Sequence, residues 1–183
     1  MKLRIYDVRL AFAKTVFEAK AVTAGSDPRY AAAFILVPNH PALVEINNTI
    51  VTVANEKWGA KGPETLALLR KKLHICLHEG DEKPGYEGFP GNWFISASNA
   101  VRPRIVDRNN NPLVKTDGRP YSGCYVNAVI DIWAQDNTYG KRINASLMGV
   151  QFLRDGDAIG GCTPASEDDF EDLTVGANVE DFA

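Results

Sequence analysis

Cysteine is scarce in this sequence. The three cysteines, Cys76, Cys124 and Cys162, lie far apart and form no CxxC pair. An odd number of widely spaced cysteines argues against a disulfide framework, and a zinc knuckle needs closely spaced ligand pairs. We therefore expect a protein of a reducing compartment.

Long apolar runs are also missing. No stretch of 18 apolar residues occurs, and charged residues at positions 2, 4, 7 and 9 interrupt the N-terminal segment. This pattern gives neither a membrane span nor a signal peptide. We expect a soluble protein of the cytoplasm with no membrane partner.

The C-terminal residues 155–183 contain no Lys or Arg. They hold nine of the 23 acidic residues and therefore carry a charge of −9. Residues 1–154 hold all 20 basic residues and the remaining 14 acids, a charge of +6. The chain thus combines a cationic body with an anionic tail, and such charge blocks are often interaction tails.

Large apolar residues lie among the acids of this tail. We expect one folded domain over residues 1–161 and a flexible tail over residues 162–183 that docks into a basic groove with an apolar floor. A tail that only increases solubility is the alternative. The predicted regulatory residues are Glu167, Asp168, Asp169, Phe170, Glu171, Asp172, Glu180, Asp181 and Phe182.

Residues 121–154 have the clearest strand pattern. From residue 124 to 134 every even position is apolar, which is the period of a strand with one face in a core. The odd positions mix Tyr125 and Trp133 with polar residues, so this outer face can meet water or a ligand. Residues 136–140 carry turn chemistry, and a second alternating run follows. The pattern predicts a long β-hairpin.

Strands are also predicted over residues 2–12, 30–37, 73–78, 93–99 and 101–107. Pro103 favours an edge position for the last of these because it cannot donate a ladder hydrogen bond. In the run 73–78, His74, Cys76 and His78 would share one face. This superficially resembles a metal set, but no second ligand pair stands at a suitable spacing.

Two helices are predicted between the second and third strands. Pro41 suits a first helical position, and Gly59 ends a run whose apolar residues recur at helical spacing. Gly62 and Pro63 then open a shorter helix. The apolar positions of the longer helix are Leu43, Ile46, Ile50, Val53 and Ala54.

Aromatic and basic residues gather in the loops. The Gly/Pro-rich loop 83–93 carries three aromatics beside a lysine, and five cations fall between residues 102 and 119, where only two acids occur. Cations that follow phosphates and rings that stack on bases are the components of a single-strand groove, although loop aromatics also serve as plugs. Tyr125 and Trp133 are the leading stacking candidates. The predicted DNA-binding residues are Lys83, Tyr86, Phe89, Trp93, Arg102, Arg104, Arg108, Lys115, Arg119, Tyr121, Tyr125, Trp133, Tyr139, Lys141 and Arg142.

Several blocks of sequence resemble a family of bacteriophage single-stranded DNA-binding proteins, related in design to small phage replication proteins with an OB-fold and an acidic tail. The match covers most of the chain from about residue 58 onward. The blocks are KWGAKGP (57–63), GDEKPGYEGFPGNWFISASN (80–99), RP (102–103), YSGCYVNAVIDIWAQDN (121–137), GVQFLRDGDAIGG (149–161) and EDDFED (167–172).

The resemblance implies that residues 1–161 are an OB-type single-stranded DNA-binding domain and that residues 162–183 are its flexible acidic tail. The implied fold is mainly β: a five-stranded OB-type barrel with a long β-hairpin, one or two inserted helices and an acidic C-terminal tail. The resemblance also implies sequence-independent binding that coats and protects single-stranded DNA in phage replication and recombination. Duplex DNA would bind when the tail is removed, and replication or recombination proteins would bind the tail. No cofactor is implied, and a homodimer stays open. If a phage encodes the protein, the expected location is the host cell's cytoplasm.

Two other classes remain at this point. A metal-dependent nuclease would use the acids and histidines around His78 and Asp155, but no nucleophile elbow, P-loop or HExxH motif is present. We therefore expect no catalytic residues. A protein-interaction or virion structural module would use the Asn-rich turns and the extended hairpin.

Overall fold

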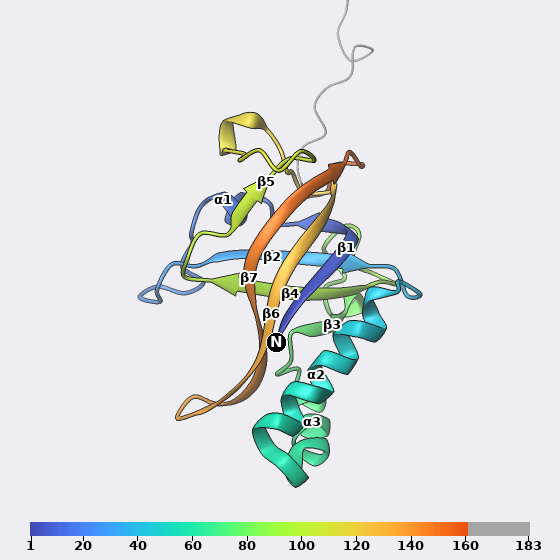
Figure 1. Ribbon diagram of the computed structural model, residues 1–183, viewed down its shortest axis with the longest axis vertical. Helices are drawn as coiled ribbons and strands as arrows, with labels where there is room; N and C mark the ends of the chain where they lie inside the picture. The colour runs from blue at the N-terminus through green and yellow to red at the C-terminus, as the bar shows by residue number, and fades with distance from the viewer. Residues whose placement is uncertain (161–183) are drawn as a thin grey trace, which may run out of the picture.

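Residues 1–160 are described by a computed structural model, in which seven strands form one sheet (Figure 1). Neighbouring strands are antiparallel except for β5 and β7, which run parallel. In sheet order the strands are β3 (Leu77–Glu79), β4 (Trp93–Asn99), β2 (Tyr30–Leu36), β1 (Lys2–Ala11), β6 (Tyr125–Asn137), β7 (Gly140–Arg154) and β5 (Arg104–Val106). The helices are α1 (Lys14–Phe17), α2 (Ala42–Trp58) and α3 (Gly62–Lys71), with 3-10 turns η1 (Gly59–Lys61), η2 (Gly80–Glu82) and η3 (Lys115–Asp117).

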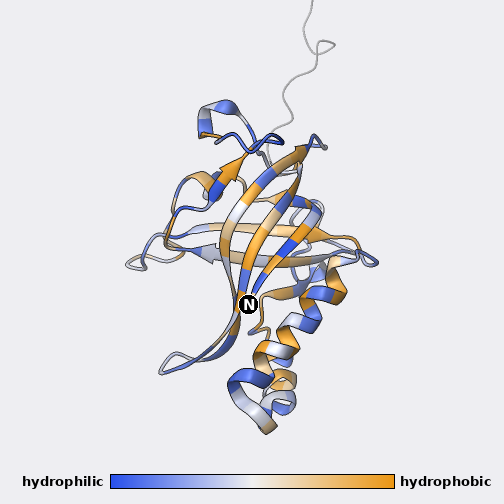
Figure 2. Ribbon diagram, viewed as in Figure 1, coloured by the Kyte–Doolittle hydropathy of each residue, from blue (hydrophilic) through white to orange (hydrophobic). Residues whose placement is uncertain are grey.

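The predicted long hairpin is formed by β6 and β7. The two strands pair as far as Asn137 opposite Gly140 at the turn. Even positions 126–132 of β6 are buried, whereas odd positions 125–131 are partly exposed. Figure 2 shows hydrophobic and hydrophilic bands along both strands. One face of the ribbon therefore enters the core and the other is available to the surface.

The inserted helices also follow the prediction. All five predicted apolar positions of α2 are buried, and Gly59 ends the helix with a positive φ of 54°. The indole Nε1 of Trp58 donates a hydrogen bond of 2.8 Å to a carboxylate oxygen of Asp136. The end of α2 is thus joined to the tip of the hairpin, and both helices lie below the sheet in Figure 1. In residues 1–160 no helix is long and apolar enough to cross a membrane.

The sheet has seven strands, not the five that the resemblance implies. The additional strands, β3 and β5, are three residues each and stand at the two edges. Pairing of β3 starts only at Leu77, because Leu73 takes a φ of 56° where α3 ends and turns the chain. The prediction of a strand over residues 73–78 is therefore wrong for residues 73–76, and His74 and Cys76 lie outside the strand.

A second, smaller core covers the outside of β1, β2 and β4. The loop between η2 and β4 folds back over these strands and inserts Phe89, which is 1% exposed. Ile159 also belongs to this cluster. Phe89 is therefore a plug beneath its loop, and almost none of its surface is exposed to solvent.

The segment 155–160, which follows β7, is held against residues 121–123. The backbone N–H of Ile159 donates to the carbonyl of Ser122 at 3.0 Å, and the guanidinium of Arg9 donates to the carbonyl of Asp157 at 2.7 Å. Gly123 has a φ of 107°, and a Cβ at this position would lie 2.0 Å from the Asp157 carbonyl oxygen. Only glycine allows this close approach.

We expect Gly123→Ala to destabilise the fold more than Gly25→Ala does. Both positions have positive φ, but a Cβ on Gly25 would meet nothing within 4 Å, so its variant carries backbone strain alone. The additional loss at Gly123 should be roughly 1–3 kcal/mol, the usual cost of overpacking. Urea denaturation of both variants measures the difference, and equal losses would show that segment 155–160 does not pack on Gly123.

Candidate nucleic-acid interface

A groove crosses the outer face of β1, β6, β7 and β5, and we call it the basic groove. Its volume is about 530 Å³. Three cations, one aromatic ring and several side-chain amides line it. The lining residues are Lys2, Arg4, Tyr6, Arg104, Val106, Asn110, Asn127, Ala128, Val129, Met148, Gly149, Val150 and Gln151.

Strand register builds this groove. Arg4 of β1 stands opposite Val129 of β6, Val129 stands opposite Gly149 of β7, and Gly149 stands opposite Arg104 of β5. One row across four strands thus has an arginine at each end and a low floor between them. Gly149 has no side chain, and a Cβ there would lie 3.2 Å from the Arg104 carbonyl oxygen, so glycine lets β5 approach β7.

The electrostatic character of the groove is positive. No acidic residue is among its lining residues in the described part of the chain. The acids nearest in sequence are engaged elsewhere: Asp7 pairs with Arg154 at 2.9 Å, and Asp131 pairs with the amino group of Met1 at 2.7 Å. An uncompensated row of cations attracts a polyanion.

Asp107 is held in the turn beside the groove. Its carboxylate accepts hydrogen bonds from the side chain and backbone of Asn111 and from the backbone of Asn109, at 2.8–3.0 Å. These bonds, that of the Asn111 side chain first, lower the pKa of Asp107 below its ordinary value of 3.8. The charge of this carboxylate is therefore stabilised within its own turn.

Side-chain amides form a connected ladder on the floor of the groove. Asn127 donates from its amide to the amide oxygen of Gln151 at 3.2 Å, and Gln151 donates to that of Asn110 at 3.2 Å. The backbone N–H of Asp7 donates to the amide oxygen of Asn127 at 3.1 Å. Much of the hydrogen-bonding capacity of these amides is thus used inside the protein.

Two aromatic side chains stand on the same outer face. Tyr6 is 58% exposed and lines the groove, and Trp133 is 39% exposed further along β6. The indole Nε1 of Trp133 donates to the hydroxyl of Ser146 on β7 at 3.0 Å. That bond fixes the ring over the hairpin.

The predicted residues are spread over several surfaces rather than gathered in one. Arg104 lines the basic groove. Arg108 and Arg119 line a smaller hollow, where the Arg119 guanidinium lies 4.9 Å from the ring centroid of Phe152. Tyr86, Phe89, Lys115 and Tyr121 line a third, mostly apolar groove.

The remaining predicted residues lie outside these three hollows. Tyr139, Lys141 and Arg142 are exposed at the hairpin tip, where the Lys141 ammonium lies 5.7 Å from the Trp58 ring centroid. Arg102 is exposed before β5, Trp93 is partly buried at the start of β4, and the Lys83 ammonium lies 5.3 Å from the Tyr86 ring centroid. The predicted tail residues lie outside the described part of the chain.

Tyr125 is already occupied within the protein. The guanidinium of Arg154 stacks 3.6 Å from its ring centroid. Gly156 packs against the same ring so closely that a Cβ there would lie 2.8 Å from a ring carbon. In this conformation Tyr125 has less free ring surface than Tyr6 or Trp133.

Sequence reasoning missed the contribution of β1. Lys2, Arg4 and Tyr6 share the outer face of this strand, whereas Leu3 and Ile5 are buried. The alternation that marks the strand also separates these residues by face. The alternation of residues 2–6 could therefore be read from the sequence. The position of β1 beside β6, which brings these residues to the groove, could not.

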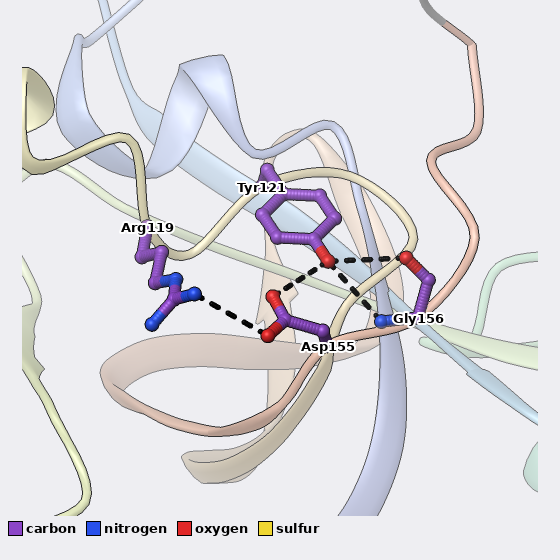
Figure 3. A network of polar contacts seen from close by, with 4 residues as sticks. All are labelled: Arg119, Tyr121, Asp155 and Gly156. Atoms are coloured by element: carbon purple, nitrogen blue, oxygen red, sulfur yellow. Dashed lines mark hydrogen bonds and ion pairs between the residues drawn. The ribbon is translucent and has the colours of Figure 1, made fainter. Parts of the chain in front are cut away.

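Tyr121 anchors the segment after β7 through a polar network (Figure 3). Its hydroxyl donates a hydrogen bond of 2.9 Å to a carboxylate oxygen of Asp155 and accepts one of 3.2 Å from the backbone N–H of Gly156. The guanidinium of Arg119 forms an ion pair of 3.3 Å with the same carboxylate group. Partial burial, together with the Asp155 charge, raises the pKa of Tyr121 above its ordinary value of 10.0. The phenol therefore stays a neutral donor at physiological pH.

No metal or thiol chemistry emerges from the described residues. Within residues 1–160, no three His, Cys, Asp or Glu side chains stand close enough to hold a metal ion. Burial raises the pKa of Cys76 to about 12 and that of Cys124 to about 11, which keeps both thiols protonated.

A β-rich domain with an acid-free basic groove across its sheet has the features of a protein that binds a polyanion. A family model described as "Enterobacter phage Enc34, ssDNA-binding protein" matches residues 1–182. Protein p50 of Acyrthosiphon pisum secondary endosymbiont phage 1 is 43% identical over 183 residues, which is 98% of each chain. The chain belongs to the family of the Enc34 phage single-stranded DNA-binding protein.

Solved structures agree with this fold. The Enc34 single-stranded DNA-binding protein in complex with ssDNA matches with a TM-score of 0.71 at 23% identity, over 86% of this chain and 88% of that chain. The single-stranded DNA-binding protein gp2.5 of bacteriophage T7 matches with a TM-score of 0.53 at 9% identity, over 84% and 91%. The family confirms the resemblance seen in the sequence and is one of DNA-binding proteins, not of enzymes.

Proposed function

We propose that this protein binds single-stranded DNA in the basic groove, independently of base sequence, and so coats and protects the strand during phage replication and recombination. The observation that carries the proposal is the row from Arg4 to Arg104 across four strands, with no acid among the lining residues of residues 1–160. Family membership supports the same ligand.

The arrangement of cations suits a phosphate backbone. Lys2, Arg4 and Arg104 line the two sides of a floor made of Val129, Gly149 and other small or apolar groups. Cations at the sides can follow the phosphates while bases lie on the floor and on exposed rings. Each phosphate contact releases counterions, so affinity should fall steeply with salt.

The amide ladder supports binding without sequence preference. Reading a base by hydrogen bonds requires donors and acceptors that are free to face its edges. The amides of Asn127, Gln151 and Asn110 bond to one another instead. Stacking on Tyr6 and Trp133 would favour no base, because every base has a ring face.

The strand pairing supports an OB-type barrel beneath the groove. β1 pairs with both β2 and β6, β2 pairs with β4, and β6 pairs with β7. β5 follows β4 in the chain and pairs in parallel with β7, so the β4–β5 segment links the two sides of the strand order. The amide of Asn99 at the end of β4 also donates to the Leu147 carbonyl of β7 at 3.1 Å. β4 and β5 together would serve as the third strand of five.

We also propose that the acidic residues 162–183 compete with DNA for the basic groove and recruit replication or recombination proteins when DNA displaces them. Two features of the sequence support this: the absence of Lys and Arg after residue 154, and the +6 charge of residues 1–154. The covalent link makes the competition intramolecular, with an effective concentration on the order of millimolar for a short flexible linker.

Charge reversal at either end of the arginine row should weaken DNA binding for all sequences alike. Arg4→Glu and Arg104→Glu should each flatten the slope of log affinity against log salt by ~0.7 per lost phosphate contact. Lys72→Glu, an equal charge change at the end of α3, is the control. Fluorescence anisotropy with dT and mixed oligonucleotides across a salt series measures the slopes. Equal slopes in all three variants would place the DNA elsewhere.

Removal of either exposed ring should cost stacking energy. Tyr6→Ala and Trp133→Ala should each weaken oligonucleotide binding by ~1–3 kcal/mol. Tyr125→Ala should weaken it less, because the ring of Tyr125 is already stacked on Arg154. Circular dichroism checks that each variant is folded. A larger loss at Tyr125 than at the other two positions would contradict the proposed stacking surface.

Truncation after residue 160 should tighten binding to single-stranded DNA at low salt and extend it to duplex DNA. The gain should shrink as the Debye length falls from ~30 Å at 0.01 M to ~8 Å at 0.15 M. Titration of full-length and truncated protein with both ligands at several salt concentrations measures it. A tail that only increases solubility would leave the affinities the same at every salt concentration.

A further inference from the structure

The apolar groove lies at the end of β1, apart from the basic groove, and also has a volume of about 530 Å³. Its walls are mainly aromatic and aliphatic. They are contributed by Phe12, Phe17, Tyr86, Phe89, Tyr121 and Ile159, and Lys14 and Lys115 also line the groove.

Phe12 presents its ring to this groove from an unusual backbone conformation. It has a φ of 62° and its side chain is 39% exposed. The ring of Tyr86 meets it edge to face, with centroids 5.6 Å apart. A large non-glycine residue with positive φ is uncommon and often belongs to a functional surface. The two half-exposed rings of Phe12 and Tyr86 thus form an aromatic part of the apolar groove.

The apolar groove fits an apolar side chain better than a phosphate. Lys115 is already paired with Glu18, and Glu87 also lines the groove. Lys14 and nearby Lys83, whose ammonium lies 5.3 Å from the Tyr86 ring centroid, add positive charge. The surroundings therefore suit a ring that is flanked by acidic residues.

The C-terminal residues 161–183 have this composition, and they follow directly on a residue that lines the apolar groove. Gly160, the last described residue, is one of its lining residues. Residues 161–183 contain seven acids, no Lys or Arg, and the sequence EDDFED around Phe170. Phe170 follows Gly160 by ten residues, which can span at most about 33–36 Å when extended. The ring can therefore return to the groove beside which its segment begins.

We propose that the apolar groove binds the side chain of Phe170 from the protein's own acidic segment. This anchor holds the following acids close to the basic groove, so the inference rests on the proposed function of that groove. From Tyr6 in the basic groove to Ala11 in the apolar groove, β1 advances five residues, about 17 Å. The 13 residues after Phe170 can reach at most about 43–47 Å, which is enough to cover this separation.

The strength of such an anchor suits a displaceable contact. Burying one phenylalanine side chain favours the docked state by a factor of roughly 10 to 100. The covalent link adds an effective concentration on the order of millimolar. At that concentration the ring alone does not saturate the apolar groove, so docking also needs the attraction between the neighbouring acids and the basic groove. DNA that neutralises the basic groove removes this attraction and releases the segment.

Photocrosslinking in the full-length protein tests the location. Phe170→benzoylphenylalanine should crosslink to residues 12–17 and 86–89, as mapped by mass spectrometry, and the same replacement at Phe182 is the matched control. Adding Phe12→Ala should reduce the crosslink at these residues severalfold, whereas Val22→Ala, at a position 88% exposed in the β1–β2 connection, should not.

Each other outcome overturns the proposal. Crosslinks from position 170 to Arg4 or Arg104 would place the ring in the basic groove itself. Crosslinks between molecules that increase with protein concentration would show that a second copy of the protein occupies the apolar groove. No crosslink, or equal yields from positions 170 and 182, would show that the apolar groove does not bind the side chain of Phe170. Oligonucleotide anisotropy on the same samples reports DNA binding separately, so loss of the proposed function is distinguished from loss of the anchor.

Discussion

The pairing of β6 with β7 is the interaction on which the rest of the structure depends. One face of this ribbon supplies Val126, Ile130 and Ile132 to the core, and the other supplies the floor of the basic groove. Because side chains alternate along a strand, the same register that buries the first set exposes the second. A shift of one residue would exchange them, so stability and the proposed DNA-binding surface are specified together.

The elements with a strong local period could be predicted from the sequence. The apolar spacing of α2 and the even positions of β6 depend only on residues close in the chain. The strand predicted over residues 73–78 was partly wrong because Leu73 takes a left-handed conformation that no local period reveals. The row from Arg4 to Arg104 joins four strands, and its register is set by pairing between distant segments.

The candidate site shows the same limit. Basic and aromatic composition predicted the kind of surface, but not which ring would be free. Phe89 is buried because its loop folds back on β2 and β4, and Tyr125 is stacked by Arg154 from the far end of β7. Such neighbours are separated by long stretches of chain, so only the tertiary structure distinguishes a plug from an exposed ring.

The position of Arg104 on β5 has a consequence for how a ligand enters. β5 is only three residues long and is the outermost strand of its sheet, with β7 on one side and no further strand on the other among residues 1–160. One wall of the basic groove is thus the border of the sheet rather than its middle. A polymer can be laid in sideways across such a border and does not have to be threaded from one end. Under the proposed function of the basic groove, a circular strand, which has no end, should therefore be as accessible to this protein as a linear one.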